Sequence, residues 1–345
     1  MITNIYINTL DEEDAIVLRK PKKMNAAAKL IMTLAAVAAL AAASLCLCAC
    51  RGREPGKTVK VSGAYALYPM MSKWTEEYKK VRPDITVEVS GGGAGKGMAD
   101  ALAGLVDIGM VSREIKPEET AKGAAYVSVV KDAVVPTINA ANPVRDKLRA
   151  RGVTREEFVK IFVTREIKTW GELAGDAEVR DPIKVYTRAD ACGAAETWAK
   201  YLGDYAQEDL TKAADAGIMN DPDLAAAVTN DKLAIGYNNI NFAYDVKTGK
   251  NIAGLGVAPL DLNGNGQLDA DEDFYGNQAD LLQAIAKNKY PSPPARDLNL
   301  VTKGAFEGEA KEFVKWILTE GQKYVAASGY IPLPPAKLAA QLKSL

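Results

Sequence analysis

From Thr58 onward the sequence alternates strand-like and helix-like segments, and this alternation is its strongest constraint on the fold. Apolar residues that alternate or run together predict strands at 58–62, 85–89, 106–111, 126–138, 183–186, 234–237 and 298–301. Apolar residues at helical spacing predict helices at 70–81, 98–105, 154–162, 278–288 and 308–328. Thr154, with Glu157 three residues later, is typical of a capping box at a helix start. The order favours an α/β fold with a mainly parallel sheet.

Composition limits the chemistry available to this chain. Its 345 residues, 48% hydrophobic and 25% charged, are typical of a globular protein, and the length favours two domains. A net charge of -1 provides no basic field for nucleic acid, so no nucleic-acid partner is expected. The chain has 0 His, which excludes Ser/His and Cys/His nucleophile pairs and His-ligated metals.

The N-terminal segment indicates export. Basic residues from Arg19 to Lys29 precede an uncharged run, Leu30 to Ala49, that is long enough to span a bilayer. The run ends at Cys50 after the small Ala49, which resembles the bacterial lipobox, whose Cys is lipidated. An ordinary transmembrane anchor is the alternative. We expect a signal peptide over 1–49, with 1–23 as an over-extended start, lipidation of Cys50, and a tether over 50–57.

Export reduces the number of functions that are plausible for this chain. Little ATP or NAD is present outside the cytoplasm, so nucleotide-driven enzymes are disfavoured. After cleavage Cys192 is the sole Cys besides the lipidated Cys50, so no internal disulfide is expected.

Three junctions built from small residues precede expected helices, at Gly63–Pro69, Ser90–Gly97 and Ala191–Ala195. Glycine lets consecutive backbone N–H groups point inward, and a helix N-terminus adds partial positive charge, so such loops suit an oxyanion. A tight turn without a ligand is the alternative. A nucleotide P-loop is strongly disfavoured because Ser90 replaces its first Gly and Gly97 replaces its magnesium-binding hydroxyl residue.

Arg188 lies at the end of an expected strand, just before the third junction. Its guanidinium could grip an oxyanion with two parallel hydrogen bonds while Asp190 orients it. The alternative is a surface ion pair between Arg188 and Asp190.

These motifs, taken in order, resemble the phosphate-type solute-binding proteins of ABC importers, over about Val59 to Pro334. The similar stretches are Gly63-Ala with Tyr68-Pro69 and Lys73-Trp74, then SGGGAGKGM with VDIGMVSREI, FVTREIKTW, Arg188-Ala-Asp190, Ala234 to Tyr237, and GQKYVAASGYIPLP.

The resemblance implies an α/β, two-lobed periplasmic-binding-protein fold (type II, Venus flytrap). Residues 58–135 and 293–345 would form lobe I, and 136–292 lobe II. The protein would be a monomeric, lipid-anchored, non-enzymatic carrier without an organic cofactor, on the periplasmic or extracellular face of the cell membrane. It would capture phosphate or a related oxyanion and pass it to an ABC permease. The implied ligand residues are Ala66, Leu67, Tyr68, Gly93, Ala94, Gly95, Ser112, Arg188, Asp190, Cys192, Gly193 and Ala194.

The chain departs from the family at the positions that normally carry hydroxyl groups. Leu67 stands for a Thr, Ala94 for a Ser, and Cys192 and Ala194 for a Ser and a Thr. Ser112 replaces the family's Asp, the charged acceptor that distinguishes protonated phosphate from sulfate. Arg188 and the backbone donors remain. The ligand therefore stays open between phosphate, another anion and a small organic molecule.

Residues 261–272 match the EF-hand calcium-loop template at every specified position. Gly266 would make the sharp turn, and Ca²⁺ would have a structural role within lobe II. An acidic turn without calcium is the alternative. The expected ligands are Asp261, Asn263, Asn265, the Gln267 carbonyl, Asp269 and Glu272.

Two other functions compete with transport. Cys192 lies at an expected helix N-terminus, which would lower its pKa and suit a nucleophile, but no His is available as its base. The other function is a non-transporting lipoprotein of the same fold that senses a ligand or scaffolds a partner.

Overall fold

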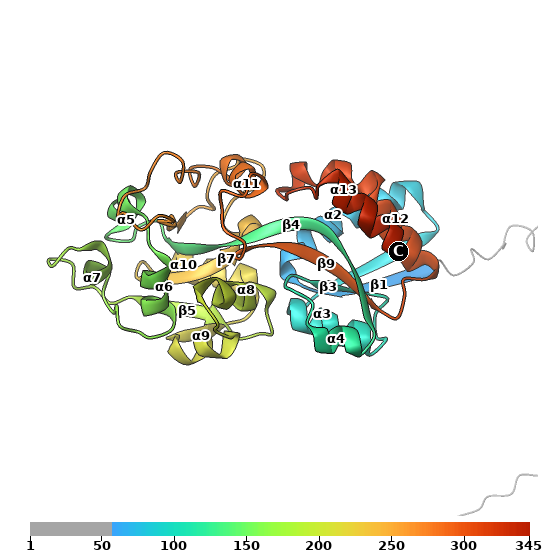
Figure 1. Ribbon diagram of the computed structural model, residues 1–345, viewed down its shortest axis with the longest axis horizontal. Coiled ribbons are helices and arrows are strands. Elements are labelled where there is room, and N and C mark those ends of the chain that lie inside the picture. Colours follow the sequence, from blue (N-terminus) through green and yellow to red (C-terminus); the bar gives the residue numbers. More distant parts are fainter. Residues whose placement is uncertain (1–56) are drawn as a thin grey trace, which may run out of the picture. The chain divides into compact units, whose positions relative to one another are not determined.

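The computed structural model describes residues 57–345, drawn as a coloured ribbon in Figure 1. The expected signal peptide, Cys50 and the tether up to residue 56 lie outside the described residues. Lys57, expected to end the tether, is the first residue of β1 (Lys57–Gly63). Residues 57–345 belong to one compact unit.

The strands form a mixed sheet in the order β2-β1-β3-β9-β4-β7-β5-β6, with β8 paired to β4. The prediction of a mainly parallel sheet is wrong, because β4 pairs antiparallel with β7, β8 and β9. The reason is that β4 carries the chain out of the first lobe and β9 carries it back (Figure 1). The remaining bounds are β2 (Ile85–Gly91), β3 (Ile108–Val111), β4 (Ala124–Asn139), β5 (Lys184–Arg188), β6 (Ala216–Ile218), β7 (Ala234–Asn239), β8 (Leu255–Val257) and β9 (Ala295–Lys303).

Two hydrophobic cores divide the described chain into lobes. Lobe I is built around buried residues from 59–130 and 298–330, including Trp74 and Phe313. Lobe II is built around residues from 133–295 with Ile331, including Trp170 and Trp198. The α/β, two-lobed architecture expected from the sequence is therefore confirmed. The expected lobe limits, at 135/136 and 292/293, stay a prediction.

The helices of lobe I correct two predictions. Helix α3 begins at Gly93, not at Met98, so most of the Gly-rich junction forms the first turn of the helix. A Cβ on Gly97 would come within 2.4 Å of the Met110 carbonyl oxygen, so glycine is what lets this turn pack against the strands. The helix expected over 308–328 ends at Leu318 and is followed by two 3-10 turns. The lobe I helices are α2 (Tyr68–Val81), α3 (Gly93–Leu102), α4 (Pro117–Ala121), α12 (Gly308–Leu318) and α13 (Pro335–Ser344), with η1 (Tyr65–Leu67), η3 (Glu320–Tyr324) and η4 (Ala326–Ser328).

Lobe II confirms the predicted capping box. The Thr154 hydroxyl accepts from Glu157 N at 3.2 Å, and Glu157 Oε2 accepts from Thr154 N at 2.9 Å. Within residues 57–345, no helix is both long and apolar enough to cross a membrane. The lobe II helices are α5 (Arg145–Arg151), α6 (Arg155–Phe162), α7 (Trp170–Ala174), α8 (Gly193–Leu202), α9 (Gln207–Ala213), α10 (Asp221–Asn230) and α11 (Gln278–Ala286), with η2 (Ile240–Phe242).

Candidate functional site

The structure brings the small-residue junctions of the two lobes into direct contact. Gly95 N donates to the Ala191 carbonyl oxygen at 3.1 Å. A Cβ on Gly93 would lie 2.5 Å from the same oxygen, and a Cβ on Gly193 would lie 2.3 Å from Ser112 Oγ. Glycine at these positions therefore allows the lobes to close directly upon each other.

Arg188, the last residue of β5, has a fully buried side chain at this junction. Its Nε and Nη2 donate to the two carboxylate oxygens of Asp190 at 2.7 and 2.6 Å, and Nη1 donates to Asp221 at 2.5 Å. Because the Asp190 side chain is only 8% exposed, the alternative of a surface ion pair is wrong. These bonds use three of the five guanidinium N–H groups, and no hydrogen bond to the described residues uses the other two.

The surroundings keep Arg188 charged. Burial lowers its pKa, but the charges of Asp221 and Asp190 outweigh burial and hold the pKa above its usual value. The Tyr65 ring lies 5.9 Å from the guanidinium carbon and adds a cation–π contact.

Sequence reasoning missed the side chains behind Arg188. Asp221, which accepts from Arg188, also accepts from Asn239 Nδ2 at 2.7 Å. The Asn239 side-chain oxygen accepts in turn from Arg296 Nη2. Arg296 then faces Asp132, with 3.8 Å between Nη2 and Oδ2. The one sequence signal for this chain of contacts was Asp132, a charged residue inside the apolar strand expected over 126–138, since a buried charge requires a partner.

Arg296 has unused hydrogen-bonding capacity. It is 8% exposed, and its Nε and Nη1 are buried without a hydrogen-bond partner among the described residues. Burial lowers its pKa from the usual value, and nearby Asp132 opposes that shift. Burial raises the pKa of Asp132 to about 7, although Arg296 lowers it.

The other predicted ligand residues fall into distinct environments. Ala66, Leu67, Ala94 and Ala194 are buried in the cores, whereas Tyr68 is 37% exposed. The N–H groups of Gly95 and Cys192 are already bonded, to Ala191 O and Gln207 Oε1. The first turn of α8, which contains Gly193 and Ala194, has N–H groups without intrahelical acceptors.

The structure argues against the competing hypothesis that Cys192 is an activated nucleophile. This residue is the N-cap of α8, but its thiol is buried. Burial raises its pKa to about 12, although the charge of Arg188 lowers it. The thiol therefore stays protonated at neutral pH and is a poor nucleophile.

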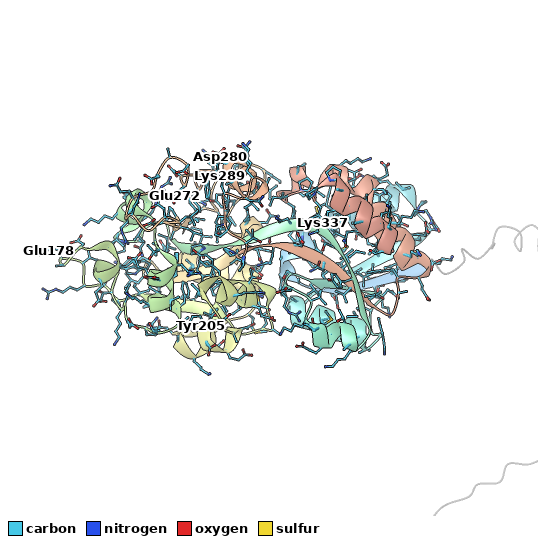
Figure 2. The ribbon with its side chains drawn as sticks, in the orientation of Figure 1. Glu178, Tyr205, Glu272, Asp280, Lys289 and Lys337 are labelled. Atoms are coloured by element: carbon cyan, nitrogen blue, oxygen red, sulfur yellow. The ribbon has the colours of Figure 1, made fainter. Side chains whose placement is uncertain are left out.

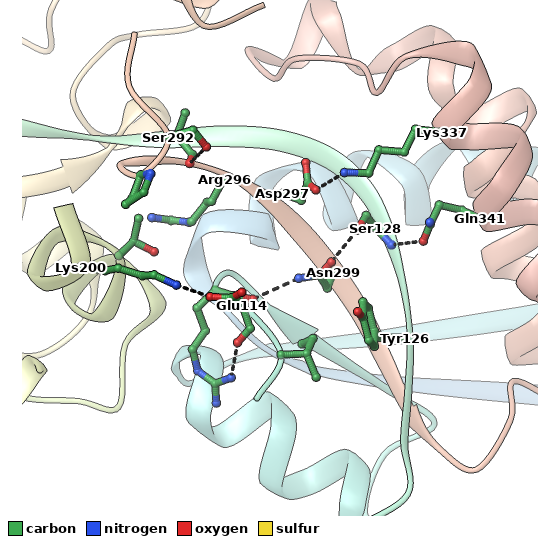
Figure 3. Close-up of a pocket in the computed structure, with 15 residues that line it drawn as sticks. Glu114, Tyr126, Ser128, Lys200, Ser292, Arg296, Asp297, Asn299, Lys337 and Gln341 are labelled. Carbon is green, nitrogen blue, oxygen red and sulfur yellow. Dashed lines mark hydrogen bonds and ion pairs between the residues drawn. The ribbon is translucent and has the colours of Figure 1, made fainter. Parts of the chain in front are cut away.

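Two solvent-accessible cavities lie near the junction between the lobes. Figure 2 labels Tyr205, which lines a cavity of about 1150 Å³, and Lys337, which lines one of about 430 Å³. Neither cavity wall includes a predicted ligand residue. Figure 3 shows Lys200 of lobe II paired with Glu114 of lobe I across the smaller cavity. Arg113 adds an ion pair to Glu196 at 3.0 Å, so charged pairs hold the lobes together at this edge.

Comparisons with known proteins agree with this architecture. The model of the PBP superfamily domain matches residues 51–320. The phosphate-binding protein PstS of Bacillus subtilis is 26% identical over 84% of this chain and 85% of its own length. PstS of Pseudomonas aeruginosa is 26% identical over 80% of this chain and 83% of its own.

Solved structures show the same fold. A phosphate ABC transporter substrate-binding protein of Clostridium perfringens, described as putative in its function and solved with bound phosphate, superimposes with a TM-score of 0.65 at 24% identity. The match covers 81% of this chain and 100% of that one. An ABC-type phosphate transport receptor of Vibrio cholerae gives a TM-score of 0.57 at 21% identity, over 80% and 100% of the two chains. The chain therefore belongs to the PBP superfamily, and phosphate-binding proteins of the PstS type are among its relatives.

Proposed function

We propose that this protein is an extracytoplasmic solute-binding protein that captures phosphate or a related oxyanion between its lobes and delivers it to an ABC permease. The observation that carries the proposal is Arg188, a fully buried cation where the lobes meet, with two N–H groups that no hydrogen bond to the described residues uses. A desolvated guanidinium beside a helix N-terminus suits an oxyanion. The phosphate-binding relatives support the same ligand class.

The contacts around Arg188 indicate the role of each residue in binding the anion. Asp190 and Asp221 hold the Arg188 guanidinium in one orientation. The N–H groups of the first turn of α8, with Gly193 and Ala194, supply uncharged donors. The unpartnered Nε and Nη1 of Arg296 supply a second cationic contact. Gly93, Gly95 and Ser112 complete the wall from lobe I.

The buried groups of the candidate site carry more carboxylates than guanidinium groups, and this excess of negative charge affects anion binding. Two guanidinium groups, of Arg188 and Arg296, face the three carboxylates of Asp132, Asp190 and Asp221. An anion is repelled by a net negative cluster, so a protonated Asp132 favours its entry. The pKa of Asp132, raised to about 7, makes that proton available near neutral pH.

Isothermal titration tests the ligand. Residues 51–345 are titrated with phosphate, then with sulfate and molybdate. We expect one-to-one binding of at least one of these oxyanions. Absence of heat with all three would reject an oxyanion ligand. It would favour the non-transporting sensor or scaffold. The missing hydroxyl groups and the already bonded N–H groups of Gly95 and Cys192 support that alternative.

The lipid anchor has its own test. Expression of the full chain in a bacterial host should place it in the membrane fraction, with a diacylglyceryl mass on Cys50. The variant Cys50→Ala should lose that mass. A retained, unmodified leader in the unchanged chain would instead indicate a transmembrane anchor.

A further inference from the structure

The loop of residues 261–272 in lobe II has buried ends and an exposed middle. Asp261 at its start is 4% exposed and Glu272 at its end is 5% exposed. The residues between them from 262 to 267 are exposed. Glu272 is labelled in Figure 2. Two carboxylates are therefore removed from water at the base of a polar loop.

Backbone N–H groups fold this loop around its carboxylates. Asp261 accepts from Gly264 N at 2.7 Å and from Gly266 N at 2.9 Å. Glu272 Oε1 accepts from Leu262 N at 3.2 Å and from Asn263 N at 3.1 Å. The Glu272 carboxylate therefore lies against the start of the loop, beside Asp261, although ten residues separate it from Leu262.

Glu272 has one oxygen without a partner. Its Oε2 is buried and accepts no hydrogen bond from the described residues. Two further carboxylates, those of Asp261 and Asp269, lie near enough to repel the negative charge of Glu272. Within residues 57–345, none of these three carboxylates forms an ion pair with a basic side chain. A buried carboxylate left in this state is costly, and a bound cation removes the cost.

We propose that this loop binds one Ca²⁺, with Asp261, Asn263, Asn265, the Gln267 carbonyl and Glu272 as direct ligands and Asp269 acting through water. The set consists of oxygen atoms, in a loop of the length and glycine placement that Ca²⁺ requires. Glu272 Oε2 supplies the open half of a bidentate carboxylate.

The loop must tighten around the ion. Among residues 57–345, no three Asp, Glu, Cys or His side chains already converge closely enough to hold a metal. Asp269 Oδ2 instead accepts from Asn263 Nδ2 and Asn265 Nδ2, each at 2.8 Å. Calcium binding would exchange these two contacts for amide oxygens directed at the ion.

The position of the loop indicates what the ion stabilises. Asp261 N donates to Val153 O at 3.0 Å, and Leu268 N donates to Ala150 O at 3.0 Å, so the loop is fastened to the end of α5. On the other side, Leu260 N donates at 3.1 Å to the hydroxyl of Tyr275, which forms an aromatic cluster with Phe274 and Tyr290 in lobe II. Bound Ca²⁺ would therefore join α5 to that cluster, without contacting Arg188.

Titration with CaCl₂ and thermal unfolding test the site in residues 51–345 and in two variants. Glu272→Gln removes the proposed bidentate ligand. Asp273→Asn makes the same change of charge at the adjacent exposed residue, outside the ligand set. We expect one Ca²⁺ per chain, a higher melting temperature in Ca²⁺ than in EGTA, and at least a tenfold loss of affinity in Glu272→Gln. Asp273→Asn should stay within about twofold of the unchanged protein.

Melting in EGTA separates ion binding from general damage. Without Ca²⁺, Glu272→Gln should melt at the same or a higher temperature than the unchanged protein, since it removes a buried, repelled charge. Absence of both heat and a melting shift up to about 10 mM Ca²⁺ would overturn the proposal, because the weakest loops of this type bind in the millimolar range. Equal losses of affinity in the two variants would also overturn it.

Discussion

Asp132 and Arg296 lie directly opposite each other on β4 and β9, and both side chains are buried. Their closest charged atoms are 3.8 Å apart. Arg296 contacts Asn239, Asn239 contacts Asp221, and Asp221 contacts Arg188. A continuous buried chain of polar contacts therefore links the candidate anion site to the two strands that join the lobes.

The Asp132 carboxyl should make stability fall as the pH rises. Its pKa in the folded protein is about 7, above the ordinary value of 3.8. A raised folded pKa stabilises the fold fully at low pH, and this contribution is lost as the pH rises through 7. Between pH 5 and pH 8 the loss should be about 2 to 3 kcal/mol. Urea unfolding over this range measures it.

Asp132→Asn should remove this slope because Asn does not titrate. Asp146→Asn is the matched control, since Asp146 is 96% exposed, and it should keep the slope. An unchanged slope in Asp132→Asn would show that Asp132 does not titrate in this range.

Arg188 should dominate anion affinity. Arg188→Ala should weaken binding of the oxyanion by roughly 2 to 4 kcal/mol, because the buried anion loses its charge partner. Arg188→Lys keeps a charge but loses the paired contact with Asp190. Its affinity for the oxyanion should therefore lie between those of the unchanged protein and Arg188→Ala. Titration calorimetry measures both, and circular dichroism verifies folding.

Arg151→Lys is the matched control for Arg188, because Arg151 also pairs with a carboxylate, that of Glu157 at 2.7 Å. It should leave affinity unaltered. Full affinity in folded Arg188→Lys and Arg188→Ala would remove Arg188 from the site.

Gly193 should be required for closure. A Cβ at this position would meet Ser112 Oγ at 2.3 Å and Ser112 O at 2.5 Å across the lobes. Gly193→Ala should therefore hold the lobes apart and weaken anion binding at least tenfold, at a cost of about 1 to 3 kcal/mol in the closed state. Small-angle scattering and titration measure these effects.

Gly276→Ala is the control, since a Cβ there meets nothing within 4 Å. It should bind and scatter like the unchanged protein. Gly193→Ala with normal affinity would mean that binding does not need this contact.

Cys192 should be inert in the folded protein. Burial raises its pKa to about 12, so little thiolate exists at pH 8. In residues 51–345, where it is the sole Cys, a disulfide reagent should react slowly under native conditions and rapidly in guanidinium. Rapid labelling of the native protein would restore Cys192 as a candidate nucleophile.

Local sequence pattern was sufficient to predict most of the strands, some of the helices and one part of the candidate site. Within residues 57–345, alternation predicted seven of the nine strands, and helical spacing predicted α2, α6, α11, α12 and part of α3, because each depends on residues close together in the chain. It did not predict α4, α5, α7, α9, α10 or α13. Thr154 and Glu157, three residues apart, formed the predicted capping box for the same reason. Arg188 and Asp190 are two residues apart, so their pairing was also visible in the sequence. The helical conformation of Gly93–Gly97 was not visible in the sequence, because packing against β1 and β3 decides it.

Residues close together in the chain were enough to predict the alternation of strands and helices, the Gly-rich junctions and the Arg188–Asp190 pair. Tertiary structure alone decided that Asp132, Asp221, Asn239 and Arg296 lie behind Arg188, and that Gly193 of one lobe meets Ser112 of the other. It also argued against Cys192 as a nucleophile, since burial raises the pKa of the thiol despite its place at a helix N-terminus. The physical reason is that partners distant in sequence are chosen by sheet register and lobe closure, which no local periodicity encodes.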